Sequence, residues 1–313
     1  MKVVIHIGTE KTGSTTLQEF MRLNRDVFLS NGVYVPKCLG RLNHRKLAVY
    51  CMNYNKSDEF IKKKGLIKKE KRDIFRQEVS DALAKELREL DQGAIDTVLI
   101  SSEHFHSRLT DISEVERLKA LFFVNGVDVK VVCYLRKQSY LMESKYSTYL
   151  KGGGYASFKV FSKDCDKSSR YYDYDHFLSI WEKCFSIDNI SVREFSRAKF
   201  KENNLCIDFL EFAGLEVKKE EISFPEDQNT SFSRFGMIMM RLVNRVYKKN
   251  EKSRVRKKRR KRLVAFIFNT FSGNKPRLLS QDERNMIDKS FDRSNLEVSN
   301  RYGIQLFSDI NNN

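Results

Sequence analysis

The chain has 313 residues, a hydrophobic fraction of 41%, a charged fraction of 32% and a formal net charge of +17. The two fractions are those of a globular protein, and this length is enough to bury a full core, so disordered and fibrous classes are excluded. The excess of cations predicts an anionic partner, without choosing between a nucleotide, an acidic glycan, an anionic membrane face and nucleic acid.

The cysteines and the apolar runs indicate in which cellular compartment the protein is expected. Six cysteines are scattered with no C-x-x-C pair and no Cys/His cluster, which favours reduced thiols over a disulfide framework or a zinc site. The first apolar run is interrupted by His6 and Gly8, unlike a signal peptide. No apolar stretch reaches the roughly 18 residues of a spanning helix. We therefore expect a cytoplasmic protein.

The first twenty residues predict a strand, a glycine-bearing loop and a helix. Residues 3–7 are mostly β-branched, which is typical of a strand buried on both faces. Gly8 and Gly13 allow a tight turn, and the helix is expected to start with Ser14, Thr15 and Thr16. Such a loop presents free N–H groups and the positive end of a helix dipole, so it predicts a cradle for a phosphate-like anion.

The position of the loop lysine separates this loop from that of kinases. Gly8 and Gly13 keep the frame of the common P-loop, G-x-x-x-x-G-K-[ST]. Ser14 stands where that motif has its lysine, and the cation of this loop is Lys11. The sequence therefore has no lysine at the position that contacts the β- and γ-phosphates in a kinase or ATPase.

Further along, strands and helices alternate. After a short strand near 33–36 and a helix over 42–54, we expect a long amphipathic helix within 56–91, with Ile74 on its apolar face and Gly93 at its end. Strands at 97–100 and 129–135 are each followed by helices, at 115–123 (ending near Asn125 and Gly126) and 139–150. This order predicts an α/β fold with a central parallel sheet flanked by helices in three layers.

Three polar side chains follow predicted strands directly. Lys11, Glu103 and Arg136 each come after the carboxyl end of a strand. Ligands of parallel sheets bind beyond these ends. We therefore expect the three residues to share one site.

The rest of the chain continues the fold and then becomes helical. We expect a polar loop at 155–172, helices at 174–185, 205–212, 235–247 and 280–302, a strand at 190–195 and a loop at 225–231. With no clear linker, we predict one domain over 1–313. It comprises an α/β nucleotide-binding core at 1–227 and a helical C-terminal portion at 228–313, with a basic stretch at 248–262.

Arg136 and Ser144 form a second candidate anion site. One follows a strand and the other lies eight residues later in the next predicted helix. A guanidinium fork with a nearby hydroxyl suits a terminal phosphate. An isolated arginine after a strand is more often part of a surface ion pair, so this interpretation depends on the loop that precedes it.

Together the two motifs resemble the sulfotransferases that use 3′-phosphoadenosine 5′-phosphosulfate (PAPS). The resemblance rests on Gly-x-x-Lys-Thr-Gly-Ser-Thr-Thr at 8–16 and on Arg136…Ser144, and weaker blocks over nearly the whole chain look like bacterial members presumed to act on glycans. It implies a P-loop-like fold in which Lys11 contacts the phosphosulfate bridge. The 5′-phosphate would be held by Thr12, Gly13, Ser14, Thr15 and Thr16, and the 3′-phosphate by Arg136 and Ser144.

The resemblance also implies the reaction. PAPS would donate its sulfuryl group by in-line displacement to a carbohydrate hydroxyl, leaving 3′,5′-phosphoadenosine (PAP), with no metal required. The family uses Glu or His as the base at the end of the strand before the Arg-bearing one. That position offers Glu103, which we favour, and His104. A carboxylate there can also be no more than a helix N-terminal residue.

The acceptor residues are less defined. Asn43, His44 and His106 are candidates for the acceptor pocket, although a lone histidine such as His44 is more often structural. We expect the pocket to be built from segments 36–92 and 151–172.

The simplest interpretation of the basic stretch 248–262 is a solvated loop or helix face with no binding function. Because the apolar residues 263–268 follow it, the sharper hypothesis is peripheral contact with an anionic cytoplasmic membrane face through 248–268. Nucleic acid is not expected as a partner, since no nucleic-acid-binding motif accompanies the run. Two rival functions remain open: a P-loop nucleotide kinase, and a non-catalytic nucleotide- or polyanion-binding protein.

Overall fold

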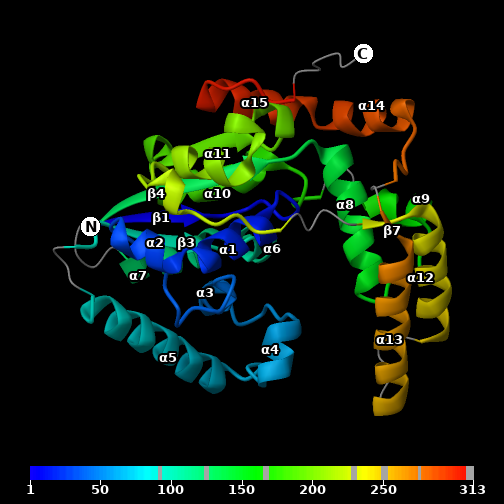
Figure 1. Ribbon diagram of the computed structural model, residues 1–313, viewed down its shortest axis with the longest axis horizontal. Coiled ribbons are helices and arrows are strands. Elements are labelled where there is room, and N and C mark those ends of the chain that lie inside the picture. The colour runs from blue at the N-terminus through cyan, green and yellow to red at the C-terminus, as the bar shows by residue number, and fades with distance from the viewer. Residues whose placement is uncertain are drawn as a thin grey trace. The chain divides into compact units, whose positions relative to one another are not determined.

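The structure is a computed structural model that describes residues 1–90, 94–122, 127–164, 169–226, 231–247, 253–273 and 276–307. Its contacts divide the chain into two compact units (Figure 1). The first unit consists of Met1–Arg136, Tyr174–Glu226 and Ser294–Asn313, and the second of Lys137–Asp173 and Asp227–Arg293. The two units are described separately below.

The first unit is built on a five-stranded sheet in which every neighbouring pair is parallel. Its strands are β1 (Lys2–His6), β2 (Val33–Tyr34), β3 (Thr97–Ser101), β4 (Asp128–Leu135) and β5 (Ile190–Glu194). The spatial order is β2-β3-β1-β4-β5, so β3 and β4 lie on either side of β1. The predicted α/β fold with a parallel sheet is confirmed.

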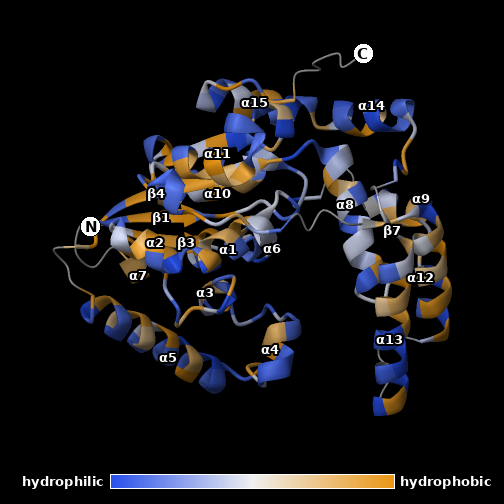
Figure 2. Cartoon of the chain, viewed as in Figure 1, coloured by the Kyte–Doolittle hydropathy of each residue, from blue (hydrophilic) through white to orange (hydrophobic). Residues whose placement is uncertain are grey.

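The sheet is covered on both faces, which explains its continuous apolar strands. Val4, Leu99 and Val132 face one side of the sheet. There they pack with Leu17 and Phe20 of α1 (Ser14–Leu23) and with residues of α2 (Arg25–Ser30) and α11 (Leu205–Ala213). The alternate residues of the strands are also buried: Val3, Ile5, Val98, Ile100, Val131 and Cys133. In Figure 2 the strands are accordingly hydrophobic along most of their length.

The helices of the first unit include two that the sequence analysis did not predict, at 25–30 and 104–108. The helices are α1 (Ser14–Leu23), α2 (Arg25–Ser30), α3 (Arg45–Cys51), α4 (Glu59–Lys64), α5 (Lys69–Arg88), α6 (His104–Arg108), α7 (Ile112–Phe122), α10 (Tyr174–Cys184), α11 (Leu205–Ala213) and most of α15 (Asp292–Tyr302). Short 3-10 turns occupy Ile187–Asn189, Arg197–Lys199, Lys201–Asn203 and Lys219–Glu221.

The long amphipathic helix expected within 56–91 is α5, which has 20 residues and buries Phe75, Val79 and Leu83, but residues 56–64 do not belong to it and one of its expected apolar positions is exposed. Gly65 adopts a left-handed conformation (φ +69°) that ends α4, and α5 begins only at Lys69. Ile74, expected on the buried face, is 61% exposed. Two helix termini were expected, one at Gly93 and one near Asn125 and Gly126. These positions lie outside the described residues.

The second unit is mainly helical. It contains α8 (Gln138–Lys151), α9 (Phe158–Phe161), α12 (Arg234–Val246), α13 (Arg254–Phe271) and α14 (Gln281–Ser290), with a 3-10 turn at Ser162–Asp164. Two short strands, β6 (Ser231–Phe232) and β7 (Ser272–Gly273), pair antiparallel. Its core gathers Tyr146, Leu150, Phe232, Met240 and Ile267.

Two further expectations need correction here. The segment 155–172 is not simply a loop, because Ser157 accepts a hydrogen bond from the N–H of Val160 and starts α9. The helix expected over 280–302 is two helices, α14 and α15, separated at Phe291. The side chain of Phe291 is buried, and its backbone (φ −108°, ψ 2°) is not α-helical. No helix among the described residues is long and apolar enough to cross a membrane.

Candidate functional site

The loop after β1 lies against the ends of both neighbouring strands. The N–H of Tyr134 in β4 donates to the carbonyl of Gly8 over 2.8 Å, and the N–H of Thr9 donates back to the carbonyl of Tyr134 over 2.9 Å. On the other side, a Cβ added to Gly8 (φ +103°) would lie 3.3 Å from the Cα of Glu103, just after β3. Glycine is therefore needed at position 8 for this close approach.

The second half of the loop is shaped by local contacts. The hydroxyl of Thr12 donates to the carbonyl of Thr9 over 2.6 Å, and Lys11 has a left-handed backbone (φ +68°). Gly13 is also left-handed (φ +71°), and a Cβ there would lie only 2.3 Å from Cδ2 of Leu205. A side chain at position 13 would thus be strained by both its backbone angle and its neighbour.

The end of this loop leaves the start of α1 open to an anion. The helix begins at Ser14 as predicted, and Gly13 at its N-cap has no side chain to bond the first N–H groups. Within the described residues no side chain caps these groups, and the first turn, Ser14, Thr15 and Thr16, contains no acidic residue. The positive end of the helix is therefore uncompensated, as an anion-binding loop requires.

Arg136 reaches this loop from the end of β4. Its Nη1 donates to the carbonyl of Lys11 over 2.7 Å, and its guanidinium carbon lies 5.3 Å from the centre of the Phe195 ring. The hydroxyl of Tyr174 donates to the carbonyl of Arg136 over 2.5 Å. These contacts place a cation directly beside the loop. Ser144, its predicted companion, is a half-buried residue of α8 in the second unit.

Glu103 is held by two amides. Its Oε2 accepts a hydrogen bond of 2.6 Å from Nε2 of Gln18, and its Oε1 accepts one of 3.4 Å from Nδ2 of Asn43. Although Glu103 is the residue before α6, its side chain does not cap that helix. Gln18 was not singled out by the sequence; the available signal was a polar residue between Leu17 and Phe20 on an otherwise apolar helix face.

His104 and Ser102 flank this carboxylate. His104 Nε2 lies 3.8 Å from Oε1 of Glu103. Burial lowers the pKa of His104, against the opposing effect of the nearby Glu103, so the ring is mostly neutral near pH 7. Among the described residues, His104 Nδ1 and Ser102 Oγ are buried without a hydrogen-bond partner. Such atoms are uncommon in folded proteins, and here they fit a polar ligand beside Glu103.

His44 and His106, by contrast, are occupied within the chain. The N–H of Ser101 donates to His44 Nδ1 over 3.1 Å, and His44 Nε2 donates to the carbonyl of Pro36 over 3.1 Å. Burial lowers the pKa of His44 to about 4. His106 Nδ1 accepts from the N–H of Glu10 over 3.3 Å. Both rings are buried and serve to hold segments around the site together.

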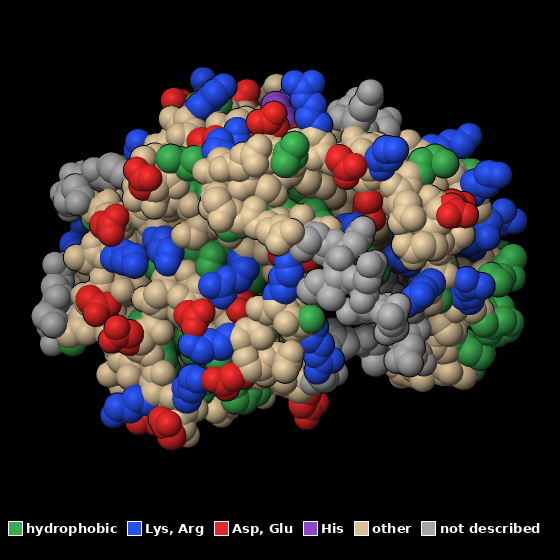
Figure 3. Space-filling model, turned by 90° about the horizontal axis from the view of Figure 1, so that it is seen from above, with side chains coloured by type: hydrophobic (Ala, Val, Ile, Leu, Met, Phe, Trp, Pro, Cys, Tyr) green, Lys and Arg blue, Asp and Glu red, His purple; other side chains and the backbone are tan. Residues whose placement is uncertain are grey.

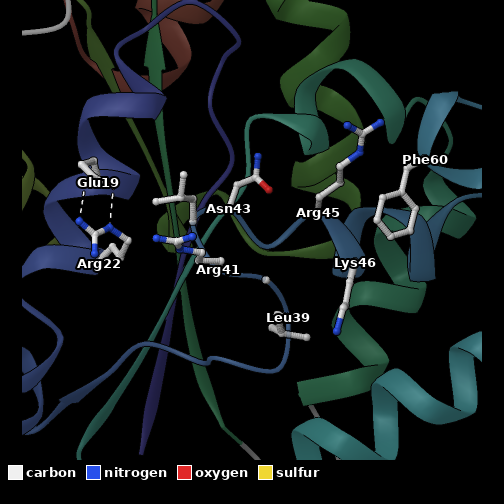
Figure 4. A pocket seen from close by; sticks show the side chains of 10 residues that line it. Glu19, Arg22, Leu39, Arg41, Asn43, Arg45, Lys46 and Phe60 are labelled. Atoms are coloured by element: carbon white, nitrogen blue, oxygen red, sulfur yellow. Dashed lines mark hydrogen bonds and ion pairs between the residues drawn. The ribbon is translucent and has the colours of Figure 1, made fainter. Parts of the chain in front are cut away.

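A cavity of about 400 Å³ opens next to Asn43 (Figure 4). Its apolar lining comes from Leu39, Leu42 and Phe60, and its wall also carries four cations and one carboxylate: Arg22, Arg41, Arg45, Lys46 and Glu19. It lies within segment 39–60 and helix α1, so part of the expected acceptor segment 36–92 does line a cavity.

The cations of this cavity differ in how they are held. Arg22 forms a bidentate pair with Glu19, at 2.6 and 2.9 Å, and Arg45 pairs with Asp58 at 2.9 Å. Lys46 Nζ donates to the carbonyl of Cys38 over 2.7 Å. Arg41 is an exposed residue among those that line the cavity. The cavity therefore carries a net positive charge beside Asn43, whose side chain donates a hydrogen bond to Glu103.

The described residues were also compared with the requirements of a metal site and of a reactive thiol. Within it, no group of three or more His, Cys, Asp or Glu side chains is placed to hold a metal ion. Five of the cysteines are described, all as free thiols, and four of them are buried. Burial raises the pKa of Cys206 to about 12, so this thiol stays protonated near neutral pH.

The known proteins that resemble this chain include an uncharacterised archaeal protein and a sulfotransferase of solved structure. No family model matches the chain. An uncharacterised protein of Archaeoglobus fulgidus is 32% identical over 148 residues, which are 47% of this chain and 38% of that protein. A crystal structure of a sulfotransferase from Alicyclobacillus acidocaldarius aligns with a TM-score of 0.45 and 14% identity, over 72% of this chain and 87% of that one. The chain's own fold and site define an α/β protein with a glycine-bearing loop between its first strand and the uncapped N-terminus of α1.

Proposed function

We propose that this protein is a sulfotransferase that moves the sulfuryl group of PAPS to a carbohydrate hydroxyl and releases PAP. One observation carries the proposal. The loop after β1 contacts the end of β3 at Glu103 and the end of β4 through the hydrogen bond from Arg136 to Lys11. An anion cradle, a carboxylate and an arginine are thus assembled in one place.

The donor would be held through its two charged ends. The N-terminus of α1 and Lys11 suit the 5′-phosphosulfate, with Thr12, Gly13, Ser14, Thr15 and Thr16 supplying N–H and hydroxyl groups. Arg136, with Ser144 of α8, is proposed for the 3′-phosphate. The open helix end supports this assignment, because the first turn has neither an acidic residue nor a capping side chain within the described residues.

The proposed chemistry assigns one task to each residue near the loop. PAPS supplies an activated sulfuryl group whose bond to the bridging oxygen breaks as the acceptor oxygen bonds to sulfur. Glu103 takes the proton of the acceptor hydroxyl, while Gln18 and Asn43 fix the direction of its carboxylate. Lys11 stabilises the charge that develops on the leaving oxygen. His104, neutral near pH 7, is the second candidate for the base.

The acceptor is proposed to occupy the cavity beside Asn43. Its apolar residues suit the faces of sugar rings, and its net positive charge favours a carbohydrate that carries carboxylate or sulfate groups. Asn43 lines this cavity and also donates to Glu103, so an acceptor bound there would lie next to the proposed base.

Calorimetric titration with PAP and with ADP tests the donor. We expect PAP to bind more tightly than ADP, and Arg136→Ala to abolish that preference. Arg197→Ala is the matched control, because Arg197 is an exposed cation of the same unit on a 3-10 turn. If ADP binds as well as PAP, or if the two variants behave alike, the PAPS assignment is wrong and a kinase becomes the better explanation.

Turnover tests whether the site is catalytic. With PAPS and a panel of acidic and neutral glycans, Glu103→Gln should lower kcat by about 100-fold or more while PAP affinity is retained. Glu116→Gln, at an exposed position of α7, should leave both quantities unchanged. Retained turnover in Glu103→Gln would reject Glu103 as the base and point to His104. Nucleotide binding without turnover for any acceptor would favour a non-catalytic binding protein.

A further inference from the structure

Helix α12 of the second unit exposes an apolar stripe. Phe235, Ile238, Leu242 and Val246 are 53%, 52%, 49% and 62% exposed. Their spacing of three, four and four residues places them on one face of the helix. Figure 3 shows hydrophobic side chains on the surface with Lys and Arg side chains close to them. Contiguous exposed apolar surface of this kind marks an interaction site.

The stripe lies on the side of α12 opposite the core. At about 100° per residue, its four members span a sector of about 80°. Met240 and Asn244 point the other way and are buried against the rest of the second unit, where Asn244 donates to the carbonyls of Leu150 and Gly154. The stripe is therefore not surplus core surface, because the helix already has a packed inner face.

Cations border this stripe along one side. By the same helical geometry, Arg234, Arg241 and Arg245 form a row next to the apolar residues. Two of these arginines are held by backbone carbonyls, with Arg234 donating to Arg277 and Arg241 to Tyr155. A helix with an apolar face flanked by a row of arginines has the pattern of helices that lie in the plane of a membrane interface.

The neighbouring helix α13 adds a high density of positive charge. Its first nine residues, Arg254–Arg262, include eight Lys or Arg, and neither α12 nor α13 contains an acidic residue. Arg260 is anchored to α12 by a 2.9 Å hydrogen bond to Asn244. Within the described part of the chain, no carboxylate pairs with Lys258, Arg259, Lys261 or Arg262. The charge of these four residues is therefore available to an anionic partner.

The apolar residues after the basic stretch are divided between the core and the surface, and Leu263 and Phe266 are 37% and 62% exposed. Ile267 is buried, and Val264 and Phe268 pack into the core of the second unit. The buried and half-buried side chains of α13 hold this helix against α12, and the two helices are in extensive contact (Figures 1 and 2). Exposed apolar residues therefore lie on both helices, and those of α12 form the stripe.

We propose that α12 and α13 form a docking surface for an anionic lipid bilayer. The apolar stripe of α12 would enter the interface, and the cations of both helices would contact lipid phosphates. Nucleic acid matches the charge, but it offers no partner for an aliphatic stripe of Ile238, Leu242 and Val246. A second copy of this chain matches the stripe, but it would bring together two clusters of like charge.

Vesicle flotation of the full chain tests the proposal without donor or acceptor. We expect binding to vesicles of phosphatidylcholine mixed with phosphatidylglycerol, little binding to phosphatidylcholine alone, and weaker binding as salt increases. The double variant Ile238→Asn, Leu242→Asn should lose at least about tenfold in affinity. Its matched control is Ile67→Asn, Ile74→Asn, since these residues are 63% and 61% exposed in the first unit.

A charge variant separates attraction from insertion. Replacing Lys258 and Arg259 by Glu should lower affinity for the anionic vesicles by about thirtyfold or more, at about fivefold for each cation removed. The control is Lys63→Glu, Lys71→Glu, which reverses two exposed cations of the first unit. All four variants should retain PAP affinity, so failure of the membrane proposal is distinguishable from failure of the proposed function.

Three outcomes would overturn the proposal. Equal binding to neutral and anionic vesicles would remove the electrostatic part of it. Tighter binding to single-stranded RNA or duplex DNA than to anionic vesicles would identify a nucleic-acid surface. Self-association in sedimentation, abolished by the Ile238→Asn, Leu242→Asn variant and accompanied by no vesicle binding, would assign the stripe to a second copy.

Discussion

Substitution of Gly13 by alanine tests whether the shape of the loop depends on this residue. Two costs are expected. A left-handed backbone costs an alanine about 1–2 kcal/mol, and Gly13 has φ +71°. The new methyl group would also lie 2.3 Å from Leu205 and 3.1 Å from Phe195, and overlap of this kind costs about 1–3 kcal/mol. Gly13→Ala should therefore lower the free energy of unfolding by about 2–5 kcal/mol.

Gly65→Ala is the matched control. Gly65 has nearly the same backbone angle, φ +69°, but no atom lies within 4 Å of the position that its Cβ would take. It should cost only the backbone part, about 1–2 kcal/mol. The two substitutions also reduce the freedom of the unfolded chain equally, so this effect cancels in the comparison.

Urea unfolding of the wild type and both variants measures these differences. Adding Leu205→Ala to Gly13→Ala should recover part of the loss, because it removes the atom that the methyl group meets. A double-mutant cycle should therefore give a coupling of about 1–2 kcal/mol. The reasoning fails if Gly13→Ala is no more destabilising than Gly65→Ala, or if Leu205→Ala brings no recovery.

Three other predictions concern pH, a buried ion pair and the proposed base. Burial lowers the pKa of His6 and of His44 to about 4, from 6.5 in the unfolded chain. Between these two pH values the unfolded chain binds more protons than the folded chain does. Each histidine should therefore lower the free energy of unfolding by up to about 3 kcal/mol as pH falls from 6.5 to 4. A flat stability profile in urea unfolding across this range would contradict it. Arg284→Met should lower the free energy of unfolding by about 3–5 kcal/mol, since Arg284 pairs at 2.8 Å with the buried carboxylate of Glu143; a loss under about 1 kcal/mol in thermal or urea unfolding would show that water reaches this pair. Gln18→Ala should lower kcat by about tenfold with PAP affinity unchanged, and an equal loss of both would indicate a structural role only.

Much of the fold could be predicted because its signals are local. A strand buried on both faces must be apolar along its whole length, so β1, β3 and β4 are visible in the sequence. Parallel strands also bring their carboxyl ends to one edge, which is why Lys11, Glu103 and Arg136 could be placed together in advance. The contacts of the loop with Glu103 and Arg136 agree with that placement.

The errors and omissions arise where distant residues decide. The expected helix 280–302 is broken at Phe291, whose ring is buried, and no helical period in the sequence marks this break. His44 looked available for an acceptor, but Ser101 and Pro36 occupy both of its nitrogens. The hydrogen bond from Gln18 to Glu103 joins residues 85 positions apart, so no spacing rule could reveal it.

The sequence by itself determined the parallel sheet, the glycine loop and the three strand ends at which polar residues converge, because these features depend on residue type and short-range order. The tertiary structure alone decided which groups hold Glu103, which cations line the cavity beside Asn43, and which face of α12 remains exposed. The physical reason is that the burial, exposure and hydrogen bonding of a side chain depend on the residues that pack around it. Most of these residues are far from it along the chain.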